Sequence, residues 1–368
     1  MALNQVGLER LGTSVTDKIG ENKNLIINGA MQVSQRGTSF ADSANGSYTL
    51  DRFNIQNSSG TPAFTVTQDT DAPHGFNNSL KVACTTADAS PAAGSFSRIR
   101  HTIEAQNLSS LAKGTASAKA QTLSFYVKTN KTGVYTVFVY DDDNNRMFSA
   151  SYTVSDTNWN RYTIDVPADT SGAINDDNGA GYVIHWGLSL GSNRTSGSLA
   201  STWATYATAN EHVGNVNFAD NTSNVWAITG VQLEVGSVAT DFEHRSFAQE
   251  LASCQRYCQV LGGNRTQELL MHGTFNGAGT VTGFYEAQVQ FREKPSFSIS
   301  NVAHVNCYGF NAVDAGSPTS MTLINAMTDK HWIYIDNALS SNVGTGGLTV
   351  MVRANSTTAC KFTLDAEL

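Results

Sequence analysis

The sequence predicts an all-β protein of two β-sandwich domains of the jelly-roll type, joined by a short helix and preceded by a short helical segment. Three observations predict this fold class. Short segments of alternating apolar and polar residues recur between clusters of Gly, Asn, Asp and Ser. The chain has 31 Gly and 6 Pro, and it is rich in Asn, Ser and Thr, which compete with a helical backbone for hydrogen bonds. Its 368 residues exceed one ordinary domain, and the pattern shows no strand–helix alternation of the parallel α/β kind.

Residues 1–22 are predicted to form a short amphipathic helix. Leu8, Leu11, Val15 and Ile19 recur at spacings of three and four residues, which places them on one helix face. Glycines in this segment each weaken an isolated helix by about 1 kcal/mol, so the helix would gain stability by packing against other chains. We therefore expect an oligomerisation or attachment segment. A helix that lies on its own domain is the alternative.

Residues 23–245 are predicted to form the first β-sandwich. Within the segment 122–128, Leu123, Phe125 and Val127 fall on one face, as the two-residue period of a half-buried strand requires. The other predicted strands are also short and are bounded by turn residues. The full set is 63–67, 80–82, 99–103, 122–128, 134–140, 147–154, 161–166, 182–188 and 225–234.

Residues 246–260 are predicted to be the helix that joins the two domains. Phe247, Leu251, Cys254 and Cys258 follow one another at spacings of four, three and four residues, which is typical of one helix face. The spacing of the two cysteines would also suit a metal, but no His or Cys cluster completes such a site. We therefore interpret both as packing residues.

Residues 261–368 return to a strand pattern and are predicted to form a second, smaller β-sandwich. Its segments alternate in the same way and are separated by turn residues. The predicted strands are 287–291, 297–299, 321–324, 331–335, 348–352 and 361–364.

Charge and hydropathy exclude several classes of partner. The net charge is −8, and no stretch concentrates Lys or Arg along a path that would follow a phosphate backbone, so we expect no nucleic acid partner. No apolar run reaches the roughly 18–20 residues of a membrane span, so we expect no membrane insertion. The first twenty residues hold no continuous apolar stretch of the kind found in a signal peptide, so we expect synthesis without one.

Motifs that would indicate catalysis are absent from the sequence. There is no nucleophile elbow, P-loop, zinc-protease motif or dinucleotide-binding glycine pattern, and five scattered cysteines do not form a disulfide framework. The acidic run 141–146 is interpreted as a hairpin turn with solvated carboxylates. His185 lies beside Trp186 in an apolar strand, which favours a packed histidine over a general base. We therefore expect a protein that is not an enzyme.

Aromatic residues in the second domain indicate a binding surface instead. A sugar stacks its apolar face on an aromatic ring while polar side chains bond its hydroxyls, and such weak sites act together in multivalent attachment. Packing in the core is the alternative for each ring. Trp332 and Tyr334 share one strand face by period two. The glycan-binding candidates are Tyr308, Phe310, Trp332 and Tyr334, chosen from a wider group that includes Phe284 and Tyr285.

Several stretches of the chain resemble a known kind of module. The segment 24–37, followed by 48–53, resembles the opening of a jelly-roll module that is common in phage tail-fibre-like proteins. The segment 226–245 with 251–257 resembles the close of that module and the helix leading into a tip domain. The ending 362–368 is similar to the last strand of such tips.

This resemblance implies a virion structural protein, usually a homotrimer, whose sandwiches are like carbohydrate-binding modules. Its partners would be copies of itself, other virion tail or capsid proteins and a host surface glycan. It would be made in the host cytoplasm and carried on the exterior of the virion. Carbohydrate-binding jelly rolls also imply a structural Ca²⁺, for which the corresponding oxygens are those of Asn28, Asp51 and Glu234. No other cofactor is implied.

Two other functions remain open from the sequence. The chain would serve as a capsid decoration or fibre-adaptor protein if it bound only other virion proteins. It would be a polysaccharide-degrading tailspike if two carboxyl groups flanked a glycosidic bond at a defined separation. Because 31 acidic residues always offer such pairs, their presence does not distinguish these functions.

Overall fold

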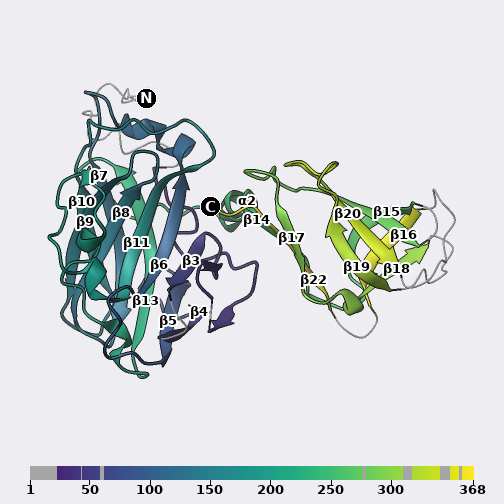
Figure 1. Cartoon of the computed structure of the whole chain (residues 1–368), viewed down its shortest axis with the longest axis horizontal. Coiled ribbons are helices and arrows are strands. Elements are labelled where there is room, and N and C mark those ends of the chain that lie inside the picture. Colours follow the sequence, from purple (N-terminus) through teal and green to yellow (C-terminus); the bar gives the residue numbers. More distant parts are fainter. Residues whose placement is uncertain are drawn as a thin grey trace, which may run out of the picture. The chain divides into compact units, whose positions relative to one another are not determined.

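The computed structural model describes residues 23–42, 44–58, 62–276, 279–309, 317–339, 349–355 and 359–368 (Figure 1). The chain divides into two compact units, which we call unit 1, ending at Phe247, and unit 2, starting at Ala248. Antiparallel sheets make up both units, so the all-β prediction is confirmed. The predicted attachment residues Leu8, Leu11, Val15 and Ile19 lie outside the described residues.

Unit 1 contains two antiparallel sheets. The six-stranded sheet has the order β1 (Ser39–Ala41), β4 (Ala63–Asp69), β5 (Ser79–Thr86), β13 (Val225–Val235), β7 (Gln121–Thr129) and β10 (Asn160–Val166). The seven-stranded sheet has the order β12 (Ala204–Thr205), β9 (Arg146–Val154), β8 (Gly133–Asp141), β11 (Ala180–Leu190), β6 (Phe96–Glu104), β3 (Phe53–Asn57) and β2 (Ser47–Tyr48). The late strand β13 lies between β5 and β7, so strands distant in sequence are neighbours in the sheet. Each strand predicted in residues 63–234 forms.

The core of unit 1 lies between these two sheets. Leu123, Phe125 and Val127, predicted to share one face of β7, are all fully buried. Phe125 meets Trp186 of the opposite sheet edge to face, with ring centroids 5.9 Å apart. Complete burial of one such Phe side chain contributes about 1.5–3 kcal/mol. The alternating pattern therefore directs the large side chains into one continuous core, with Trp226 among them.

The outer face of the seven-stranded sheet is covered by the segment 191–217 of the same chain. Hydrogen bonds hold the segment down, including one from the backbone N–H of Ser149 to the carbonyl of Ala200 at 2.9 Å. Beneath it His185 stacks on Phe138, so this histidine is packed. Short 3-10 helices interrupt unit 1: η2 (Ala105–Leu111), η3 (Ser192–Arg194), η4 (Thr208–Asn210) and η5 (Phe218–Asp220).

The acidic run 141–146 forms the predicted turn between β8 and β9, but its first carboxylate is not solvated. Asp141 is fully buried, and its carboxylate lies 2.5 Å from the Lys113 ammonium. The same ammonium lies 3.1 Å from Asp169, which also pairs with Arg146 at 2.7 Å. The prediction of solvated carboxylates is therefore wrong for Asp141, because a lysine from a distant loop folds over the turn.

The helix α2 (Phe247–Gln255) begins at the last residue of unit 1, and the rest of it belongs to unit 2. Unit 2 contains two antiparallel sheets packed around a second core. The three-stranded sheet has the order β14 (Cys258–Gly262), β22 (Lys361–Asp365) and β17 (Ser296–Ile299). The six-stranded sheet has the order β18 (Val305–Gly309), β21 (Thr349–Ala354), β15 (Leu269–Phe275), β16 (Thr280–Glu286), β20 (Trp332–Leu339) and β19 (Pro318–Leu323). A 3-10 helix, η6 (Val302–His304), precedes β18.

Two predictions for the start of unit 2 are wrong. The helix predicted over 246–260 ends at Gln255, because Cys258 begins β14 and pairs opposite Asp365 near the end of the chain. This long-range pairing overrides the local helical spacing. The strand predicted over 287–291 is a turn region, and β16 occupies the residues just before it. Ala287 and Phe291 are buried there without belonging to a strand, and Val289 is half-buried.

Neither the cysteines nor the described helices point to a particular function. All five cysteines are buried, and no disulfide joins them. Across the part of the chain that the structure describes, no group of three or more His, Cys, Asp or Glu side chains is arranged to hold a metal ion. The described helices are all too short or too polar to cross a lipid bilayer.

Candidate functional site

The outward face of the six-stranded sheet in unit 2 carries a line of large side chains that we call the aromatic row. Its members stand opposite one another in successive strand pairs: Tyr308, Met351, His272, Phe284 and Tyr334. Residues directly opposite in an antiparallel pair share a face, so the row crosses five strands without interruption. Four interstrand steps of about 4.8 Å give it a length of about 19 Å.

This face of the sheet is open in unit 2. Phe284 is 39% exposed and Met351 36%, whereas the alternating residues Ile333 and Ile335 of β20 are buried in the core. Trp332, two residues before Tyr334 on β20, is 38% exposed and extends the row toward one corner of the sheet. Large apolar side chains at this exposure, gathered on one rigid sheet, are typical of a binding surface.

Polar groups lie around the rings. The guanidinium carbon of Arg353 lies 3.6 Å from the centroid of the Tyr308 ring. At the other end, His331 meets Trp332 edge to face at 5.4 Å, and its Nε2 lies 3.2 Å from a carboxylate oxygen of Glu286. The face therefore combines ring surfaces that stack with groups that hydrogen-bond.

Part of this surface was predicted from the sequence. The structure brings Tyr308, Trp332 and Tyr334 to one sheet face, and Phe310 lies outside the described residues. Of the wider group, Phe284 belongs to the row, whereas the Tyr285 hydroxyl donates to Gln259 at 2.9 Å from the opposite face of β16. The pairing of His272 and Met351 into the row follows from strand register, which no local pattern in the sequence reveals.

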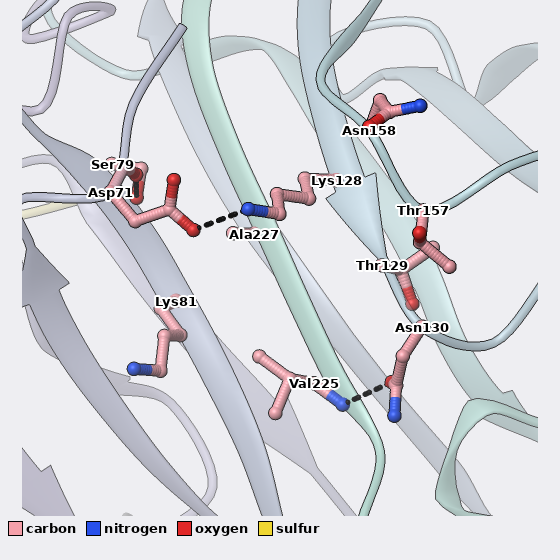
Figure 2. A pocket seen from close by; sticks show the side chains of 10 residues that line it. All are labelled: Asp71, Ser79, Lys81, Lys128, Thr129, Asn130, Thr157, Asn158, Val225 and Ala227. Atoms are coloured by element: carbon pink, nitrogen blue, oxygen red, sulfur yellow. Dashed lines mark hydrogen bonds and ion pairs between the residues drawn. The ribbon is translucent and has the colours of Figure 1, made fainter.

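A second surface lies on the six-stranded sheet of unit 1, where a pocket of about 430 Å³ opens (Figure 2). Val225 and Ala227 of β13 form its floor. Ala227 stands opposite Lys81 of β5 on one side and Lys128 of β7 on the other. The small alanine therefore lies between two long cationic side chains. We call this site the lysine pocket.

Each of these lysines pairs with a carboxylate. The Lys128 side chain extends across β13 to Asp71, with 2.7 Å between Nζ and Oδ2 (Figure 2). The indole N–H of Trp159 donates to the other oxygen of Asp71 at 3.0 Å. The hydrogen bond from Lys128, followed by that from Trp159, lowers the pKa of Asp71. This carboxyl group is therefore held in its ionised form.

The second pair behaves in the same way. The Lys81 ammonium lies 2.5 Å from Asp69. Burial is the largest influence on Asp69 and raises its pKa, but the hydrogen bonds from Lys81 and from the backbone N–H of Asp71 together outweigh it, so the pKa is lowered. The two ion pairs thus fix the lysines without using all their N–H groups.

The residues proposed for calcium serve other roles in the structure. The Asn28 side chain donates to the carbonyls of Val33 and Asp51 at 2.8 and 2.9 Å and accepts from the Val33 N–H. The Asp51 carboxylate accepts from the Gln35 backbone N–H at 2.9 Å.

Glu234 accepts from the backbone N–H and the hydroxyl of Thr240 at 2.8 and 2.7 Å. Oxygens that already hold turns together do not make up a shell of six to eight calcium ligands. The calcium site stays a prediction.

Comparison with known proteins gives structural neighbours only. No family model and no curated protein sequence matches the chain. Solved structures similar to it include a Bacteroides thetaiotaomicron protein described as a candidate for sugar binding (14% identity, 58% of this chain and 99% of that one, TM-score 0.32). They also include a CBM4 module (11%, 56% and 97%, 0.28) and a xylan-binding domain of CBM22 (12%, 55% and 98%, 0.29).

The neighbours named here are thus carbohydrate-binding modules or a protein described in such terms. At these identities and TM-scores their ligands are not transferred to this chain. The assignment of the fold rests on the strand pairing described above, and the assignment of a ligand class must rest on the side chains of the two surfaces.

Proposed function

We propose that this chain is a glycan-binding subunit on the exterior of a phage virion, a tail fibre or receptor-binding protein that attaches to host surface sugars without catalysis. The observation that carries the proposal is the open aromatic row of unit 2 with Trp332 beside it. The resemblance of the segments 24–37 and 226–245 to tail-fibre modules supports the virion setting.

Stacking explains why such a row suits a saccharide. The C–H face of a sugar packs against a ring face, and flanking groups such as Arg353 and Glu286 are placed to bond its hydroxyls. Because the rings stand on paired strands, little conformational freedom is lost on binding. A site of this kind is shallow and weak, so useful affinity requires several copies acting together.

Multivalency is the role we propose for the N-terminal segment. A homotrimer assembled through residues 1–22, which would also dock to other virion proteins, presents three aromatic rows on one particle. Linked sites convert later binding events into intramolecular ones, and avidity can exceed single-site affinity by a factor of about 10²–10⁴.

The charge state of the lysine pocket supports a role without catalysis. Glycoside hydrolysis needs one carboxylic acid whose pKa is raised so that it can donate a proton near neutral pH. In the pocket, the lysines lower the pKa of both Asp69 and Asp71. These two carboxylates are suited to hold cations and sugar hydroxyls and are poor proton donors.

The proposal is tested with the full-length chain and purified host envelope polysaccharide. Trp332→Ala and Tyr334→Ala are each expected to weaken binding by about ten-fold, the value of one lost stacking contact. Phe247→Ala is the matched control, because Phe247 is an exposed aromatic residue outside the row. Unchanged binding in the Trp332→Ala/Tyr334→Ala double variant would reject the aromatic row as the site. Release of reducing sugars from the polysaccharide would reject the non-catalytic role.

A further inference from the structure

We propose that the lysine pocket of unit 1 is a second binding site, specific for an acidic sugar residue that carries a carboxylate or a sulfate. This proposal goes beyond the neutral stacking surface of unit 2, because it adds a site of different chemistry on a different unit. It rests on the arrangement of Lys81, Lys128 and Ala227, on the exposed ammonium donors and on the size of the pocket.

The strand register places two lysines on either side of a small floor residue. Lys81, Ala227 and Lys128 occupy one transverse line across three strands. The two lysine Cα positions are therefore about 10 Å apart, two interstrand spacings. Because only a methyl group rises from β13 between them, the Lys128 side chain extends across this strand to Asp71, and the pocket opens beside it (Figure 2).

Hydrogen-bonding capacity remains on both lysines. Each ammonium has three N–H donors, and among the residues that the structure describes each has one carboxylate partner. Both lysine side chains are 37% exposed, so the remaining donors are accessible from solvent. Asp71, held by Trp159, keeps the Lys128 ammonium directed across the pocket.

Ammonium donors favour an anionic group over a neutral hydroxyl. The charges of Lys81 and Lys128 are balanced by Asp69 and Asp71, so the preference rests on the N–H donors that the two ion pairs leave accessible. A carboxylate or sulfate bonded by two ammonium groups makes charge-assisted hydrogen bonds, which are about twice as strong as neutral ones. The acidic remainder of the protein disfavours non-specific capture of polyanions, so binding depends on the pocket itself.

Size and rim chemistry favour a sugar over an inorganic ion. A volume of about 430 Å³ falls within the range of small-molecule sites and is far larger than one ion. Thr157 and Asn158, from the segment that precedes β10, stand on the rim with polar side chains (Figure 2). They are placed to meet ring hydroxyls once the acidic group lies between the lysines.

The test titrates the full-length protein with trigalacturonate and with neutral galactotriose, using calorimetry. We expect trigalacturonate to bind and galactotriose to bind at least ten-fold more weakly, with the acidic ligand losing affinity as salt rises from about 0.05 to about 0.5 M. Lys128→Gln and Lys81→Gln are each expected to weaken trigalacturonate binding about ten-fold. Ala227→Val, which keeps both charges and suits a strand, is expected to weaken it by filling the floor.

Lys131→Gln is the matched control. Lys131 pairs with Asp220 at 2.5 Å, and its side chain is 31% exposed, so the variant removes the same charge from a similar ion pair that does not line the pocket. An equal effect of Lys131→Gln and Lys128→Gln, equal binding of the neutral trisaccharide by the Trp332→Ala/Tyr334→Ala variant, or no binding of trigalacturonate would overturn the proposal. In those cases the two lysines form ordinary surface ion pairs.

The two proposals fail independently. Trp332→Ala is expected to leave the trigalacturonate titration unchanged, because the aromatic row belongs to unit 2. Lys128→Gln is expected to leave binding of neutral polysaccharide unchanged. A loss in only one titration therefore identifies which of the two surfaces was assigned wrongly.

Discussion

Mild acid is expected to destabilise unit 1 strongly, because three of its histidines are buried in their neutral form. Burial, followed by the neighbouring arginines, holds the pKa of His101, His185 and His212 well below the usual range. Arg98 and Arg194 act on the last two, and neither ring nitrogen of His185 has a hydrogen-bond partner among the described residues.

The size of this acid-induced loss of stability follows from proton linkage. In the unfolded chain these histidines titrate near pH 6.5. As the pH falls through about 6.5, the unfolded state therefore binds protons that the folded state does not bind. Stability is therefore complete above about pH 7 and is lost progressively below 6.5, down to the lowered pKa of each folded group. Between pH 7 and 5, a histidine that takes up no proton in the folded state lowers the stability by up to about 2 kcal/mol, so the three together lower it by up to about 6 kcal/mol. That total is comparable to the 5–15 kcal/mol that stabilises a typical domain.

Urea unfolding at about pH 7, 6 and 5, followed by tryptophan fluorescence, measures this effect. Trp186 and Trp226 are fully buried in unit 1 and report its unfolding. His185→Phe removes a protonatable ring but keeps the stacking on Phe138, so the acid-induced loss should fall by about one third. His74→Gln, at an exposed position, is the control and should leave the pH dependence unchanged. A wild-type unfolding free energy that stays constant from pH 7 to 5 would refute the reasoning, as would equal pH dependence of His185→Phe and wild type.

Two further variants test the packing of unit 1, both by urea unfolding. Glu211 is 1% exposed and is bound by Arg98 at 3.0 Å and Arg194 at 2.5 Å, so Glu211→Gln leaves two poorly solvated cations without a counter-charge and should cost about 3–5 kcal/mol. A loss of stability below about 1 kcal/mol would indicate that these charges are solvated and not buried. Gly29→Ala would set a Cβ 2.1 Å from the Val231 carbonyl oxygen and should cost about 1–3 kcal/mol through overpacking. Unchanged stability of Gly29→Ala would show that the two segments do not lie this close.

Alternating and short apolar segments were sufficient to predict β4 to β11 and β13 of unit 1, but β1, β2, β3 and β12 were not predicted. The pattern failed where a partner distant in sequence decided the outcome. Cys258 continues a helical spacing yet pairs with the last strand, and Asp141 lies in a predicted turn yet is buried by Lys113. Neither partner is visible from the residues nearby.

The same limit explains how much of each surface could be predicted. Trp332 and Tyr334 share a face because they are two residues apart on one strand, so period two is enough to place them together. Met351 stands opposite His272 only because β21 pairs with β15, and this register depends on the whole sheet. The lysine pocket is harder still to foresee, because Lys81 and Lys128 become neighbours only through β13, which comes much later in the sequence.

Side chains on the covered sheet face and side chains on the open sheet faces have different roles in this protein. The covered ones contribute to stability, and the open ones are placed for binding. On the seven-stranded sheet, the segment 191–217 buries Glu211 with its arginines and two of the three histidines, so changes there act on folding. The two six-stranded sheets leave Lys128 and Trp332 more than a third exposed, and exposed ion pairs and rings contribute about 1 kcal/mol or less to stability. Substitutions on the open faces should therefore alter ligand affinity while the unfolding free energy stays nearly constant. A binding defect that came with a large loss of stability would indicate a role in packing for that side chain.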